Sequence, residues 1–227
     1  MKKRKIKKSL NFLKIRIKWF YKLKGGRLLK LKSHVAMAHL VADLLEKNRN
    51  IIIDRKSLEL GAVYPDLHIL KRVPTHNVEQ LYKNYHVQTN NFINRTNDLT
   101  LSFSLGMISH YVCDTFCMPH NKKIRRYRDF KEHVAYEFVL ADEIEKFEMT
   151  ESIEGKIYWK SLEHFDFDLE TFVTTQRVEY FQQASIDPVA QARTDIENSV
   201  QACALVLKGF LNELERAQCP VLETIIA

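Results

Sequence analysis

The sequence predicts an all-α fold, built as a single domain of several helices. Glycine and proline are scarce, with Gly 6 and Pro 5 in 227 residues, and hydrophobic residues make up 45% of the chain. An all-β protein needs many turns that contain glycine or proline, so their scarcity favours helices. Apolar residues also recur at spacings of three and four, as on a helix face. No stretch approaches the roughly 20 apolar residues that span a bilayer.

Residues 1–32 form a basic tail that holds 14 Lys and Arg and no Asp or Glu. The rest of the chain has 21 basic and 28 acidic residues, so the formal charge of +7 belongs to the tail and the body is acidic. The tail also lacks the apolar core of a secretory signal peptide. We therefore expect the protein to be cytoplasmic or peripheral to a membrane. We also expect a monomer.

The tail itself has three interpretations. Its apolar residues form two helical stripes, yet Leu13–Trp19 also alternates like a strand. It could be a membrane-surface helix, a solvated or partly disordered tail, or a nucleic-acid-binding arm, and we expect the first. Gly25 and Gly26 are the expected hinge to the body.

Residues 33–227 are expected to form one helical domain. Ser33 is the candidate N-cap of a first helix over 33–46. Gly61, Pro65 and Pro74 interrupt residues 51–75, which predicts a loop or a short helix there. Apolar periodicity predicts five further helices, over residues 77–95, 99–117, 129–147, 168–183 and 188–217. The four cysteines are too few for a disulfide framework, so we expect reduced thiols in or near the core.

Two histidine–carboxylate pairs carry the chemical signal. His110 and Asp114 lie four residues apart, and His133 and Glu137 repeat this spacing. One turn of helix places both members of such a pair on the same face, where both can bind one metal ion. The sequence therefore predicts a metal site.

A further histidine lies between the pairs. Pro119 is expected to end the preceding helix, so that His120 leaves on a turn near the same pocket. Nitrogen and oxygen ligands suit zinc, and five such groups exceed the needs of one ion. Neighbouring zinc ions clamp a phosphoryl oxygen and lower the pKa of bound water, which suits the hydrolysis of a phosphoester.

These motifs resemble the bacterial zinc-dependent phospholipase C family. The resemblance runs from Ser33 to about Glu137 and depends on the order and spacing of five segments. They are Ser33-His34, Leu60-Gly61-Ala62-Val63-Tyr64-Pro65-Asp66, Leu105 to Asp114, Met118-Pro119-His120, and His133 to Glu137. The resemblance implies an all-helical phospholipase C/nuclease-like fold with a trinuclear zinc site.

The resemblance also implies a role for each matching residue. The implied zinc ligands are His34, His76, His110, Asp114, His120, His133 and Glu137. Asp114 would bridge two of the ions, and Asp66 would be the general base that orients a water for attack on phosphorus. The upstream ligand His76 is the least secure, and His68 and His86 remain alternatives. His39 should point away from the site, and His164 is expected at the surface.

The N-terminus departs from the family pattern. Family members begin with a tryptophan that binds zinc a dozen or so residues before the first histidine ligand. Here Met1 lies 33 residues before His34. Two alternatives follow. Either one metal is weak or absent, giving two or three zinc ions, or cleavage after Lys18 exposes Trp19.

The resemblance implies a phospholipase C that acts on phospholipid at a membrane surface and releases diacylglycerol and a phosphorylated headgroup. One alternative is a zinc-dependent single-strand nuclease or 3′-nucleotidase of the same fold. Such enzymes usually have Asp where this chain has Glu137, and an acidic body disfavours a polyanionic substrate, so we do not expect a nucleic-acid partner. The other alternative is a membrane-binding protein with a vestigial site.

Overall fold

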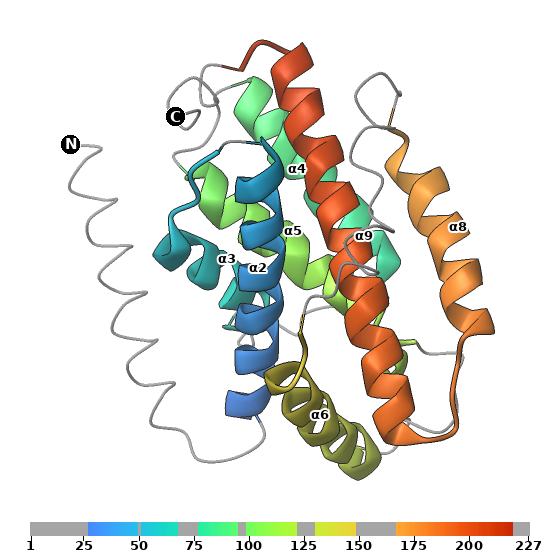
Figure 1. The fold of residues 1–227 in the computed structure, drawn as a ribbon. Coiled ribbons are helices and arrows are strands. Elements are labelled where there is room, and N and C mark those ends of the chain that lie inside the picture. Colours follow the sequence, from blue (N-terminus) through green and yellow to red (C-terminus); the bar gives the residue numbers. More distant parts are fainter. Residues whose placement is uncertain are drawn as a thin grey trace.

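A computed structural model describes residues 27–49, 51–67, 77–94, 99–121, 130–148 and 167–219. Helices make up most of this part of the chain, which confirms the all-α prediction (Figure 1). They are α2 (Arg27–Arg49), α3 (Arg55–Leu67), α4 (Val78–Ile93), α5 (Leu101–Thr115), the 3-10 turn η1 (Met118–His120), α6 (Phe130–Glu145), α8 (Leu169–Gln182) and α9 (Pro188–Arg216). The basic tail before Arg27, with Trp19, lies outside the described residues, as does His164.

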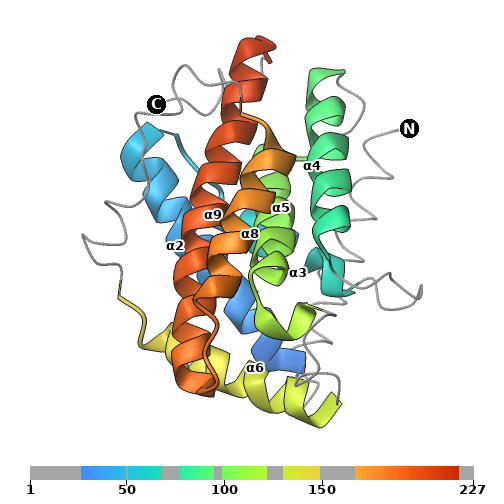
Figure 2. The same ribbon diagram turned by 90° about the vertical axis from the view of Figure 1, so that its right-hand side faces the viewer.

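Helices α5 and α9 lie at the centre of the bundle. Helix α5 packs against α2, α3, α4 and α9, and every residue of α5 except Tyr111 is buried. Helix α9 also packs against α6 and α8, and α6 lies across one end of the bundle (Figures 1 and 2). The apolar stripe expected on the last helix is confirmed, since Ile196, Val200 and Leu207 are all buried. The site described below is therefore supported by the two central helices, α5 and α9.

Side-chain caps fix where four of the helices begin. Asn77, Thr100, Asp168 and Asp187 each accept a hydrogen bond from a main-chain N–H in the first turn, of α4, α5, α8 and α9 respectively. Such a cap satisfies one of the N–H groups that the start of a helix leaves without a partner. Pro188 follows its cap at the first helical position, where the missing N–H costs nothing.

The first helix departs from the prediction, whereas the second confirms one of its two alternatives, the short helix. Ser33 is not an N-cap, because α2 begins six residues earlier at Arg27 and Ser33 is buried inside it. The sequence from Arg27 to Lys32 has no glycine or proline, so the helix continues back to the expected hinge at Gly26. Residues 55–67 form a helix despite Pro65, which lies in the last turn.

Glycine allows α3 and α5 to cross at very short range. A Cβ atom on Gly61 would lie 1.9 Å from the carbonyl oxygen of Phe103, and one on Gly106 would lie 2.1 Å from that of Leu58. Both positions need glycine because the main chains themselves are in contact. This crossing brings the end of α3, with Asp66, toward the face of α5 that carries His110.

Candidate metal centre

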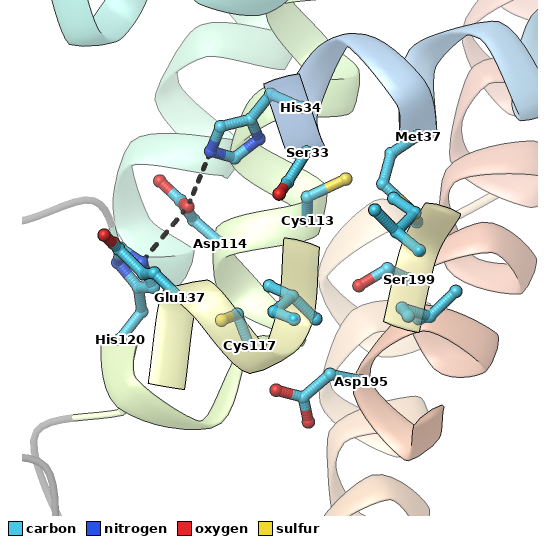
Figure 3. Close-up of a pocket in the computed structure, with 13 residues that line it drawn as sticks. Ser33, His34, Met37, Cys113, Asp114, Cys117, His120, Glu137, Asp195 and Ser199 are labelled. Carbon is cyan, nitrogen blue, oxygen red and sulfur yellow. Dashed lines mark ion pairs between the residues drawn. The ribbon is translucent and has the colours of Figure 1, made fainter. Parts of the chain in front are cut away.

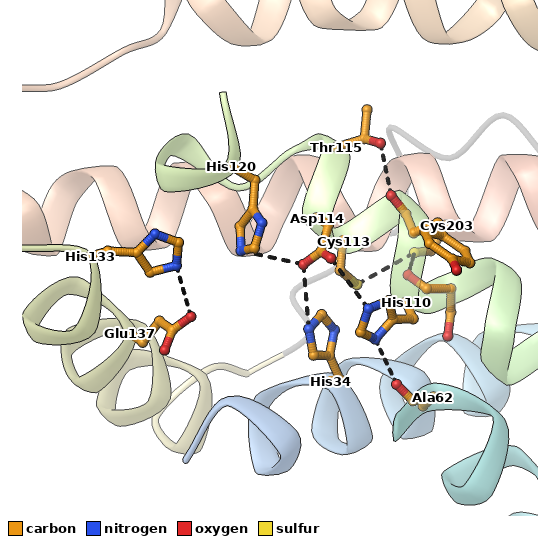
Figure 4. A network of polar contacts seen from close by, with 12 residues as sticks. His34, Ala62, His110, Cys113, Asp114, Thr115, His120, His133, Glu137 and Cys203 are labelled. Carbon is orange, nitrogen blue, oxygen red and sulfur yellow. Dashed lines mark hydrogen bonds and ion pairs between the residues drawn. The ribbon is translucent and has the colours of Figure 1, made fainter. Parts of the chain in front are cut away.

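Asp114 is the centre of the candidate site. It lies in the last turn of α5, it is 2% exposed, and three histidine rings from different elements contact its carboxylate (Figures 3 and 4). The Nε2 atoms of His34 and His120 lie 3.4 and 3.5 Å from Oδ1, and that of His110 lies 3.2 Å from Oδ2. A single carboxylate thus joins α2, α5 and η1.

The inner group consists of His34, Asp66 and His110. One potential ligand atom from each lies within 4.8 Å of the other two. The rings of His34 and His110 stack, with their centroids 4.0 Å apart and their planes 28° apart. Two stacked rings would repel each other if both were protonated, so the stack disfavours a doubly charged pair.

The orientation of His110 provides a test of this group as a metal site. Its Nδ1 lies 2.8 Å from the carbonyl oxygen of Ala62, which can only accept, so Nδ1–H is the donor (Figure 4). In the neutral ring, Nε2 then directs a lone pair at Asp114, and two acceptors face each other. A metal ion between them removes the conflict, and a backbone carbonyl on the other nitrogen is the usual way to orient a metal-binding histidine.

The outer group consists of His120, His133 and Glu137, whose potential ligand atoms also lie within 4.8 Å of one another. His133 Nε2 lies 2.9 Å from a carboxylate oxygen of Glu137 along α6, which confirms the predicted pairing across one turn. The rings of His120 and His133 meet edge to face at 5.1 Å. All three side chains are partly exposed, so the outer group is open to a substrate.

Burial and three neighbouring side chains set the pKa of His34. Burial and the adjacent His110 ring act to lower the pKa of His34. Hydrogen bonds to Asp114 and Cys113 outweigh them, so this pKa is raised above its usual value. Such an environment stabilises positive charge beside the carboxylate.

Tyr111 was not identified from the sequence. Burial raises the pKa of its phenol, and the charges of Asp114, Asp66 and Tyr64 add to the increase. The phenol therefore stays protonated beside the carboxylates and can act as a donor. Its one available signal in the sequence was its position directly after His110.

A pocket lies beside both groups, between α2, α5, α6 and α9 (Figure 3). His34, Asp114, His120 and Glu137 are part of its wall, and most of the remaining wall is apolar. The apolar and thiol side chains there are Met37, Cys113, Cys117, Leu140, Ile144 and Ile196. Cys113 and Cys117 are buried free thiols, as expected, although α5 ends before Cys117.

The structure brings together most of the predicted site residues. Those that meet are His34, Asp66, His110, Asp114, His120, His133 and Glu137. His68 and His76 lie outside the described residues, and His86, exposed on α4, is in neither group. His39 points away from the site as expected and pairs with Glu59 at 3.0 Å.

One detail of the predicted turn was wrong. Pro119 does not end the preceding helix, because α5 ends at Thr115 and Pro119 lies within η1. The main-chain N–H of Met118 bonds a side chain of α9 instead of continuing the helix. His120 still reaches Asp114, at 3.5 Å, so it lies near the same pocket as expected.

Two His/carboxylate groups joined by a buried aspartate define this helical bundle as a candidate protein of the multi-metal class, and such nitrogen and oxygen donors suit zinc. A model of one family, zinc-dependent phospholipase C, matches residues 33–186. The chain belongs to the zinc-dependent phospholipase C family. Comparison with curated proteins and with solved structures gave no match.

Proposed function

We propose that this protein is a phospholipase C that hydrolyses the glycerol–phosphate ester of phospholipids and releases diacylglycerol and a phosphorylated headgroup. The observation that carries the proposal is the Asp114 carboxylate in contact with three histidines, which links two three-residue ligand groups. Nitrogen and oxygen donors around a shared carboxylate suit at least two zinc ions. When bound, the zinc ions would lower the pKa of water and neutralise charge on the phosphoryl group.

Asp66 is the proposed general base. Its carboxylate lies with the inner group, at the end of α3, where it can orient a water molecule and accept its proton. The water oxygen forms a bond to phosphorus, the bond from phosphorus to the glycerol oxygen breaks, and that oxygen takes up a proton. A carboxylate suits this role because it is ionised at neutral pH.

Two observations support a lipid substrate over a nucleic acid. The pocket beside the ligands has a mainly apolar wall, against which a polyanion would gain little. The chain after residue 32 also carries more acidic than basic residues. In the described residues, no helix has the length and apolar character to cross a membrane. Because the proposed substrate is a phospholipid, we propose that the protein meets it at a membrane surface, with the basic tail as the attachment.

The test is zinc analysis followed by two assays on the same zinc-loaded sample. We expect two or three zinc ions per chain and release of diacylglycerol from phosphatidylcholine vesicles, with no cleavage of single-stranded DNA. Cleavage of the DNA alone would make the protein a nuclease of the same fold. A chain that binds no zinc and cleaves neither substrate would indicate a vestigial site.

The role of Asp66 is tested by Asp66→Asn, with Asp142→Asn on an exposed part of α6 as the matched control. We expect Asp66→Asn to abolish hydrolysis and Asp142→Asn to leave it unchanged. Zinc content measured on the same samples separates a base from a ligand. Unchanged zinc supports the base, whereas loss of zinc would show that Asp66 is a metal ligand.

A further inference from the structure

A buried carboxylate of α9 lies behind the outer ligand group. Asp195 is 1% exposed and accepts four hydrogen bonds. It lies nine residues beyond the last residue that matches the family model. We propose that Asp195 is a positioning residue, which holds the chain segments bearing His120, His133 and Glu137 in the arrangement that binds metal; this inference rests on the proposed zinc site.

The two oxygen atoms of Asp195 have different partners. Oδ2 accepts from the main-chain N–H of Met118 at 2.9 Å and from the phenol of Tyr136 at 2.6 Å. Oδ1 accepts from the phenol of Tyr180 at 2.7 Å and from the amide of Gln191 at 2.6 Å. One oxygen thus contacts the two segments that carry the ligands, and the other contacts α8 and α9.

The partners of Oδ2 lie next to the ligands in sequence. Met118 begins η1, two residues before His120. Tyr136 lies on α6, three residues after His133 and one before Glu137. Because η1 follows α5 and α6 is a separate helix, their relative position depends on contacts such as these. A shift of either segment would separate ligand atoms that now lie within 4.8 Å of one another.

Stability alone does not explain a carboxylate at this position. Burial raises the pKa of Asp195 to about 6, even though its four hydrogen bonds act in the opposite direction. The free-energy cost of burying the charge therefore exceeds the stabilisation from the four hydrogen bonds. Replacing such a buried charged group by a well-packed apolar one often leaves a protein at least as stable. A buried polar group can instead specify one arrangement of the segments around it. Asp195 is part of the wall of the pocket in Figure 3, but it belongs to neither ligand group found in the described residues, which fits a supporting residue better than a metal ligand.

Two tyrosines provide a matched pair of variants. Tyr136 and Tyr180 are both buried and each donates one hydrogen bond to Asp195, at 2.6 and 2.7 Å. Only the Tyr136 bond leads to a segment with ligands. Tyr136→Phe and Tyr180→Phe should cost similar stability, so a difference in zinc binding reports on positioning rather than on folding.

The experiment is a titration of the metal-free full chain with Zn²⁺ in competition with a chromophoric chelator. We expect Tyr136→Phe to weaken one class of zinc site by about 10-fold or more, as for other residues that orient ligands. Tyr180→Phe should change zinc affinity by less than about 3-fold on the same scale. In a Glu137→Gln background, adding Tyr136→Phe should have no further effect, because the affected site is already lost. Asp195→Asn should weaken the same class of site.

A second measurement needs no metal. Hydrogen exchange in the zinc-free chain should become faster in η1 and in the first half of α6 for Tyr136→Phe, and not for Tyr180→Phe. If the wild type binds zinc and the two tyrosine variants behave alike in both experiments, the positioning role of Asp195 is overturned while the proposed function stands. If the wild type binds no zinc, both proposals fail.

Discussion

The crossing of α3 and α5 gives the sharpest prediction, which concerns Gly106→Ala. The new Cβ atom would lie 2.1 Å from the carbonyl oxygen of Leu58 and 2.7 Å from the main-chain nitrogen of Ala62. Ordinary contacts of this kind are 3.4 Å or longer. Both obstacles are main-chain atoms, so no side chain can rotate away. Helix α3 must therefore move by about 1 Å to reach normal van der Waals separation.

Three contributions set the size of the effect. Alanine is better than glycine inside a helix by up to about 1 kcal/mol. Overpacking costs about 1–3 kcal/mol, and the upper end applies where main chains collide. Moving α3 also stretches the 2.8 Å hydrogen bond from His110 to Ala62, and such a bond contributes about 1 kcal/mol. We expect a net loss of about 2–3 kcal/mol, which lowers Tm by about 4–12 °C in a chain of this size.

The assay is thermal and urea unfolding in the presence of a chelator, so that zinc binding does not contribute. Gly209→Ala is the control, because its Cβ atom meets ring atoms of Phe167, the nearest at 2.3 Å, and a side chain can move. We expect Gly209→Ala to cost less than about 1 kcal/mol and to leave zinc affinity unchanged. Gly106→Ala should also weaken zinc binding, since α3 carries Asp66 and α5 carries His110. A Gly106→Ala protein with wild-type stability and zinc affinity would refute the reasoning.

Three further predictions concern the bridging carboxylate, the tail and the buried aspartate. Asp114→Ala should lose zinc binding. Zinc at 100 times Kd should stabilise the wild type by about 3 kcal/mol, and the variant should lack this stabilisation. Measuring Tm with and without Zn²⁺ tests this. Removing residues 1–26 should weaken co-sedimentation with anionic vesicles at low salt, because each Lys or Arg near such a surface contributes about 1 kcal/mol, while hydrolysis of a water-soluble phosphodiester stays unchanged. Equal vesicle binding would contradict a role for the tail. Burial raises the pKa of Asp195 from 3.8 to about 6, so the folded protein binds a proton at this carboxylate more tightly than the unfolded chain does. This proton binding stabilises the fold fully below pH 4, and the stabilisation is lost as the pH rises through 6. Asp195→Asn should lack this loss, about 3 kcal/mol, so urea unfolding at several pH values should show a flatter profile than the wild type.

The helices and the two ligand pairs were predictable because both depend on local geometry. A spacing of four residues places His133 beside Glu137 in any helix, and the capping residues mark where most helices begin. The first helix shows the limit of such signals. Serine is a good cap in general, but nothing near Ser33 stops the helix from continuing back to Arg27.

The remaining features depend on contacts between residues far apart in the sequence. Asp66 joins His34 and His110 only because two glycines let α3 approach α5, and no local pattern states which helices cross. The position of Asp195 was only weakly indicated by the sequence. With Gln191 and Ser199 it forms a polar stripe along the buried face of α9, but its partners come from α6, α8 and η1.

The two ligand groups depend on different kinds of support. The inner group is supported by direct contact between the main chains of α3 and α5, which permits little movement. The carbonyl of Ala62 also fixes the orientation of His110 through a hydrogen bond to Nδ1. The outer group rests on hydrogen bonds to Asp195, and its ligands are partly exposed. Main-chain contacts resist small displacements more strongly than a hydrogen-bond network, because hydrogen bonds tolerate a range of lengths and angles. The outer group should therefore be the one whose geometry adapts when a phosphoester enters, and the inner group should hold its ligands in place throughout.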